Sequence, residues 1–167
     1  PYRAFLADLK SAVGETSRFP SDSDILAAVV RRPMYTQLGS RKLRYILTQI
    51  ERSSRTKYDE TVSIETQNLT VEHILPDRWS TNWPLPSGAQ VQAESIYDLL
   101  VDMSDVSEAV RREMEAREAA KHTLGNLTLL TSSLNPALGN SGWAEKQARI
   151  RGSLLAINRE VAECETW

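Results

Sequence analysis

Two short strand-like segments, far apart in a chain that is otherwise helical in pattern, constrain the fold more than any other feature. Residues Leu69–Ile74 are rich in β-branched and apolar side chains, and Pro76 closes the run. Residues Leu127–Thr131 alternate in a similar way. A long insert separates the two segments. We therefore expect an α+β domain that is mainly helical, with the two strands embedded in it.

The rest of the chain shows the spacing of amphipathic helices. In residues 1–60 the pattern predicts three helices: over 2–13, from a cap within Ser21–Asp24 to a stop before Pro33, and after a cap at Ser40. Residues 91–121 are mostly helical in pattern, with Ser104 or Asp105 as the expected cap. A short helix capped by Ser132 or Ser133 should tolerate Pro136 in its first turn and end at Gly139. Further helical segments should begin at Ser141 and extend over 154–161. Residues 79–88, with two prolines and two tryptophans, indicate an ordered loop.

Length and composition are typical of one ordinary globular domain. The 167 residues suffice for a single core over 1–167, and 41% apolar with 25% charged residues argues against disorder. No apolar run approaches the ~20 residues that span a bilayer, and the start at Pro1 suggests a piece of a longer protein. The single Cys164 can form no intramolecular disulfide, and with two histidines no Cys/His zinc cluster can assemble. A reducing cytoplasm is the expected location.

The net charge of −2 conceals a strong asymmetry along the chain. Residues 1–60 carry eleven Lys/Arg against seven Asp/Glu, a net of +4, whereas 90–120 carry three against eight, a net of −5. Phosphate contacts depend on local charge, so the basic part can face DNA although the total is acidic. The candidate nucleic-acid-binding residues are Arg41, Lys42, Arg44, Arg52, Arg55, Lys57 and Lys146. As separate residues, such cations are more often plain solvent-exposed charge.

The residues that carry chemistry follow the order strand, insert, strand, helix. Glu72 and His73 end the first strand, Asn126 opens the second, and Asn135 lies in the short helix after it. These residue types suit metal-assisted hydrolysis of a phosphodiester, in which a base activates water and a cation stabilises charge on phosphate. His73 is the candidate base, while Glu72 and Asn135 offer hard oxygen ligands for Mg²⁺. Asn126 would either brace the hairpin or orient His73.

One geometric condition follows from this assignment. Neighbours on a regular strand point to opposite faces, so Glu72 and His73 can address one site only where the strand ends. Pro76, three residues beyond His73, is consistent with such an ending.

A resemblance to a known family rests on three groups of residues: Val71-Glu72-His73-Ile74-Leu75-Pro76, then Gly125-Asn126-Leu127-Thr128-Leu129-Leu130, then Asn135, Asn140 and Lys146. They resemble the HNH nuclease domain at the C-terminus of GmrSD-type modification-dependent restriction enzymes, within the His-Me finger (ββα-metal) nucleases. The resemblance covers about Leu69 to Lys146, a finger with the acidic helical insert 90–121.

The resemblance implies a DNA endonuclease or nickase of a phage-defence restriction system. It implies that His73 is the general base, that Glu72 and Asn135 hold one divalent metal, Mg²⁺ or else Mn²⁺, and that Asn126 is the middle HNH residue. It also implies a nucleotide-hydrolysing N-terminal partner domain. Many HNH nucleases have Asp-His where this chain has Glu72-His73, and the cysteine-bound zinc of some HNH domains has no counterpart beside Cys164.

Several residues have a plainer role beside the functional one. His122 could contact phosphate or assist the leaving group, but a structural role at the hairpin entrance is more frequent. Asn140, next to Gly139, fits a turn, although a shifted alignment would make it the metal ligand. Trp79, Trp83 and Trp143 could stack on bases, yet burial is the commoner fate of tryptophan, and we expect them in the core.

Two other functions remain open from the sequence. One is a catalytically silent DNA-binding or regulatory module attached to a nucleotide-hydrolysing domain. The other is an RNA-cutting member of the same finger class. A metal-dependent DNA endonuclease is the reading that uses all of Glu72, His73, Asn126 and Asn135.

Overall fold

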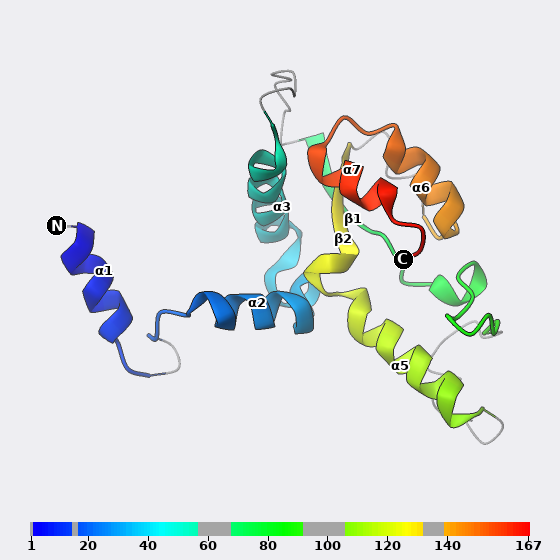
Figure 1. Ribbon diagram of the computed structural model, residues 1–167, viewed down its shortest axis with the longest axis horizontal. Helices are drawn as coiled ribbons and strands as arrows, with labels where there is room; N and C mark the ends of the chain where they lie inside the picture. Colours follow the sequence, from blue (N-terminus) through cyan, green and yellow to red (C-terminus); the bar gives the residue numbers. More distant parts are fainter. Residues whose placement is uncertain (1, 15–16, 57–67, 92–105, 132–138) are drawn as a thin grey trace.

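The computed structural model describes residues 2–14, 17–56, 68–91, 106–131 and 139–167 (Figure 1). Within these ranges the elements are α1 (Tyr2–Ser11), α2 (Asp22–Arg31), α3 (Met34–Ser54), β1 (Leu69–His73), η2 (Trp79–Thr81), α5 (Glu108–Lys121), η3 (Leu124–Asn126), β2 (Leu127–Thr131), α6 (Trp143–Arg151) and α7 (Ala156–Glu163). A mostly helical chain with one small sheet agrees with the predicted α+β class. No helix in the described ranges is long and apolar enough to cross a membrane.

The two predicted strands pair with each other across the long insert. β1 and β2 are antiparallel, and the register places Leu69 opposite Thr131 and His73 opposite Leu127. β2 has the predicted bounds, and β1 ends at His73, one residue before the predicted end. β1 therefore ends where the assignment requires, but Glu72 and His73 are both still paired with β2, so their side chains face opposite sides of the strand. The short helix predicted to carry Asn135 lies in 132–138, outside the described residues, so the complete ββα finger stays a prediction.

Of the three predicted N-terminal helices, α1 and α2 begin where the sequence predicts, and α3 begins earlier. Ser21 caps α2 through a reciprocal capping box, in which its hydroxyl accepts from the Asp24 amide and the Asp24 carboxylate accepts from the Ser21 amide. α3 starts earlier than the predicted cap at Ser40, but Gly39 has a φ of 73° and interrupts it. That backbone conformation favours glycine and forms a kink between two helical stretches, the second of which follows Gly39. Neither α1 nor α2 contains a buried residue.

The antiparallel pair β1–β2, called the hairpin below, lies at the centre of the core, with α3 and α7 packed against it (Figure 1). One core cluster joins α3 to the strands and contains Leu43, Leu47, Leu69, Leu127, Leu129 and Leu155. A second lies beyond the end of β1 and contains Ile74, Leu75, Trp79, Trp83, Leu85, Val91 and Met114. The two clusters fix the end of β1 from both sides. Trp79 and Trp83 are buried as predicted, and Trp143 packs against the second cluster while remaining partly exposed.

Several predicted helix boundaries are wrong. α1 ends at Ser11 instead of residue 13, and α6 begins at Trp143 with Gly142 as its N-cap instead of beginning at Ser141. The N-cap of α5 is Ser107, whose hydroxyl accepts from the Val110 amide, instead of Ser104 or Asp105. Toward the C-terminus, α6 ends at the C-cap Gly152, and α7 starts only after Leu155. Leu155 packs into the core beside the hairpin, which requires the chain to leave the α6 direction first.

Candidate active site

The chain leaves β1 directly after His73, and a single asparagine holds this exit. The Ile74 amide donates to the Asn126 carbonyl at 2.9 Å, and the Leu75 amide donates to the Asn126 side-chain oxygen at 2.7 Å. The Asn126 amide group donates in turn to the carbonyls of Leu75 and Lys121. Asn126 is 2% exposed. These hydrogen bonds tie the chain after β1 to the residue that precedes β2, which corresponds to the first of the two roles predicted for Asn126, bracing the hairpin.

The His73 side chain lies among polar and aromatic side chains from three other parts of the chain. Its Nε2 lies 3.3 Å from Nδ1 of His122, the residue that caps the C-terminus of α5. The Tyr35 ring from α3 meets the His73 ring edge-on, with centroids 4.3 Å apart. His122 Nε2 lies 3.9 Å from an Asp77 carboxylate oxygen. Asp77, His122 and His73 thus form a row, and we call these three residues the histidine row.

Burial lowers the pKa of His73 to about 4, and the ammonium groups of Lys146 and Lys121 act in the same direction. The negative charge of Asp77 opposes the shift. His73 is therefore neutral at pH 7, with one ring nitrogen able to accept a proton.

Glu72 points to the opposite side of the strand end and meets a buried cation. Lys146 of α6 donates from Nζ to Glu72 Oε1 at 3.0 Å and to the His73 carbonyl at 2.7 Å. Lys146 is 0% exposed. Burial raises the pKa of Glu72, against the opposing effect of Lys146, and burial lowers the pKa of Lys146. The Lys146 ammonium is thus turned inward, toward the strand end and away from any surface that DNA can reach.

The basic residues of α3 divide into two groups. Arg41, Arg44 and Arg52 line a shallow groove of about 230 Å³ together with Tyr45, Thr48 and Gln49, and we call it the arginine groove. Arg55 instead binds the buried Glu51 carboxylate at 2.9 Å. Lys42 is exposed on the same helix, and Lys57 lies outside the described residues.

Two further predicted residues bear on a metal centre. Asn135 lies outside the described residues. Asn140 sits in a turn, as its plainer interpretation predicts, and its carbonyl accepts from the Asn82 side chain at 2.9 Å. Within the described ranges, no three or more His, Cys, Asp or Glu side chains gather to hold a metal ion.

Comparison with protein families finds one family that covers most of the chain. Residues 19–167 match the family described as the C-terminal domain of GmrSD restriction endonucleases. The chain belongs to this family. As a GmrSD C-terminal domain it is a nuclease-related domain of restriction enzymes, and the substrate class of those enzymes is DNA. No curated protein and no solved structure matches the chain.

Sequence reasoning missed three residues around the strand end of this GmrSD C-terminal domain. Asp77 follows Pro76 directly, and a carboxylate so near a candidate base was a usable signal. Tyr35 reaches His73 from α3, and Trp167 donates from its indole nitrogen to the Asn126 side-chain oxygen at 2.7 Å. Both lie far from the motif in sequence, so only the fold brings them there.

Proposed function

We propose that the chain is a metal-dependent DNA endonuclease or nickase domain in which His73 is the general base. The observation that carries the proposal is the histidine row at the end of β1. A neutral histidine has a free ring nitrogen that can take a proton from water, and its pKa of about 4 makes it a weak base at pH 7. Membership of the family supports nuclease activity as the reaction class, and the histidine row contains the proposed base, His73.

One pair of tautomers is consistent with the histidine row, in which the 3.9 Å between His122 Nε2 and Asp77 is longer than a hydrogen bond. If His122 carries its hydrogen on Nε2, toward Asp77, then its Nδ1 is free to accept. His73 would then donate from Nε2 to His122 and keep the lone pair of Nδ1. In the proposed step, Nδ1 takes a proton from water as the water oxygen attacks phosphorus, and the bond to the leaving oxygen breaks. The row keeps the imidazole in place during the transfer.

The proposed metal ligands are Glu72 and Asn135, for Mg²⁺ or Mn²⁺. The donor set fits a hard cation, because Mg²⁺ takes one or two protein oxygens and keeps several waters. Lys146 engages Oε1 of Glu72, which leaves Oε2 as the oxygen assigned to the metal. When bound, the cation would polarise the phosphate and stabilise the charge that develops there. The proposal contains no structural zinc.

DNA would be held by the arginine groove. Its guanidinium groups suit phosphate oxygens, and Arg44 also donates from Nη1 to the Leu69 carbonyl at 3.3 Å. Lys42 is exposed on the same helix. In the proposed setting the domain acts within a cytoplasmic phage-defence restriction system, beside a nucleotide-hydrolysing domain.

A second candidate is a catalytically silent DNA-binding or regulatory module. The observation in its favour is the ion pair between Glu72 and Lys146, because the lysine occupies one oxygen of the proposed metal ligand. In such a module the strand end would be purely structural.

Plasmid cleavage tests the proposal. With Mg²⁺ the parent chain should nick or linearise plasmid, and His73→Ala should reduce the rate by about a hundredfold or more. Arg112→Ala, at a largely exposed position of α5, serves as the control and should cut like the parent. Matched RNA should remain intact.

The outcomes separate the candidates. If His73→Ala cuts as fast as the parent, the assignment of the base is wrong. If the parent binds DNA but does not cut it with Mg²⁺ or Mn²⁺, the silent module replaces the endonuclease. Cleavage of RNA alone would select the RNA-cutting member of the class.

A further inference from the structure

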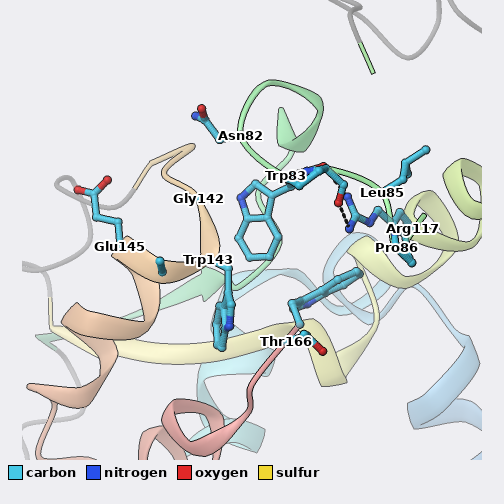
Figure 2. A pocket seen from close by; sticks show the side chains of 12 residues that line it. Asn82, Trp83, Leu85, Pro86, Arg117, Gly142, Trp143, Glu145 and Thr166 are labelled. Atoms are coloured by element: carbon cyan, nitrogen blue, oxygen red, sulfur yellow. Dashed lines mark hydrogen bonds between the residues drawn. The ribbon is translucent and has the colours of Figure 1, made fainter. Parts of the chain in front are cut away.

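A cleft of about 710 Å³ lies on the α6 side of the strand end, outside the residues that the proposed chemistry uses. Its lining includes three indole rings, from Trp83 after η2, Trp143 at the start of α6, and Trp167 in the C-terminal segment. Figure 2 shows the Trp83 and Trp143 side chains converging from these two segments. The Trp83 ring centroid lies 6.1 Å from that of Trp143 and 6.1 Å from that of Trp167. We call this space the tryptophan cleft.

The polar edges of the three rings are already engaged by the protein. The indole nitrogens of Trp83, Trp143 and Trp167 donate to the Ser141 carbonyl, the Glu165 carbonyl and the Asn126 side-chain oxygen, at 2.9, 3.1 and 2.7 Å. These bonds fix the rings in position and consume their only donors. The surface that the rings can offer to a ligand is consequently their π faces. Trp83 is 4% exposed, whereas Trp143 and Trp167 are both partly exposed. The Arg117 guanidinium already lies over the Trp167 ring, 5.7 Å from its centroid, so Trp143 is the ring best placed to offer a free face.

The charge of the tryptophan cleft differs from that of the arginine groove. Among the described lining residues the charged ones are Arg117 and Glu145. Arg117 donates to the carbonyls of Trp83 and Pro84, both at 2.6 Å, and Glu145 pairs with Arg149. The cleft therefore offers aromatic surface without an available cation, which suits an uncharged flat ring better than a phosphate.

The tryptophan cleft is directly connected to the candidate active site. Trp167 and the Leu75 amide share the same acceptor, the side-chain oxygen of Asn126. On α6, Glu145 lines the cleft while the next residue, Lys146, binds Glu72. A DNA strand bound at the end of β1 would therefore lie beside the cleft.

We propose that the tryptophan cleft binds one nucleobase unstacked from the DNA, whose ring lies against the face of Trp143. This inference rests on the proposed function, because DNA at the strand end supplies the base. A base that leaves the stack needs a replacement surface, and aromatic side chains provide one for every base type. The site favours DNA that is single-stranded or distorted near the cut, where unstacking costs least.

Binding of matched oligonucleotides tests the site without cleavage. The full chain is titrated in EDTA with a thymidine oligonucleotide of about twelve nucleotides, and with an abasic oligonucleotide of the same length and charge. Binding is followed by anisotropy and by tryptophan fluorescence. The thymidine strand should bind about fivefold to a hundredfold more tightly and quench the fluorescence. The dependence on salt should be the same for both strands, since their phosphates are equal.

Two leucine variants on α6 locate the effect. Ala144 is exposed and lines the tryptophan cleft, whereas Ala148 is exposed one turn further along the same helix. Ala144→Leu should reduce binding of the thymidine strand to the abasic level, and Ala148→Leu should leave it unchanged. Trp143→Phe, which keeps an aromatic face, should retain more of the preference than Trp143→Leu.

Each outcome bears on the inference separately from the proposed function. Equal affinity for the two strands, or equal behaviour of Ala144→Leu and Ala148→Leu, would overturn the base site. Neither result concerns the role of His73 in cleavage. Conversely, if the chain prefers the thymidine strand but never cuts DNA, the nucleobase site stands and the proposed endonuclease activity is wrong.

Discussion

The two sides of the β1 end control charge by opposite means. Toward α5, His73 is kept uncharged because burial outweighs the nearby Asp77 carboxylate. Toward α6, Glu72 is also partly buried, but it has Lys146 at 3.0 Å as a compensating cation. The strand geometry produces this contrast, since adjacent residues face opposite ways. The proposed base and the proposed metal ligand are therefore neighbours in sequence whose side chains lie on opposite sides of the strand end.

The largest expected effect comes from removing the cation on the Glu72 side. Lys146→Met leaves a partly buried carboxylate without its partner, and losing one member of such a pair costs about 3–5 kcal/mol of unfolding free energy. Urea unfolding measures the loss. Adding Glu72→Gln to the variant should restore part of the stability, because the uncompensated charge is then gone.

The control is the exposed ion pair on the same helix. Arg149 and Glu145 are 3.2 Å apart, with side chains 39% and 53% exposed. Arg149→Met should cost at most about 1 kcal/mol, since solvent screens such pairs. Equal losses in Lys146→Met and Arg149→Met would mean that the Glu72 side is not stabilised by its cation.

The next effect concerns the His73 side and its dependence on pH. The pKa of His73 is about 4 in the folded chain and about 6.5 when unfolded, so the unfolded chain takes up the proton first as pH falls. The stability that His73 contributes is complete above pH 6.5 and is lost as pH falls toward 4. The expected loss between pH 7.5 and 4.5 is roughly 2–3 kcal/mol.

Urea unfolding of the parent and of His73→Gln across this pH range, in EDTA, isolates the contribution. The difference between the two curves should change within the window from pH 6.5 to 4. Parallel curves would show that burial does not hold His73 neutral, and the contrast between the two sides would fail.

How much of this contrast the sequence predicts depends on how local each feature is. The strand end is predicted to within one residue of His73 from nearby residues, because the run of β-branched residues stops before Pro76. The inward turn of Lys146 does not follow, since lysines are rarely buried and its partner is distant in sequence. Tyr35 reaches His73 only after α3 has packed on the hairpin.

The same distinction applies to the loops and caps. The cap of α2 is predicted within the four residues Ser21–Asp24, and Ser21 provides it. The break before α7 depends on the burial of Leu155 beside the strands, which is a property of the tertiary fold. The position of Asn126 was predicted to matter, but its contact with Trp167 joins two distant parts of the chain.

The smallest expected effect tests whether the histidine row orients the base. His122→Phe keeps a ring beside Tyr35, whose ring stacks on that of His122 with centroids 5.9 Å apart, but it removes both nitrogens. The rate of plasmid cleavage should fall roughly tenfold, less than for His73→Ala, because the base is still present but less well fixed. His122→Asn retains a polar group near the position of Nδ1 and should lose less.

The loss in both His122 variants should appear in kcat, with KM and the urea midpoint close to those of the parent, because a residue that only positions the base does not hold the substrate. An unchanged kcat in His122→Phe would mean that the nitrogens of His122 do not orient His73, and that packing and burial alone position it.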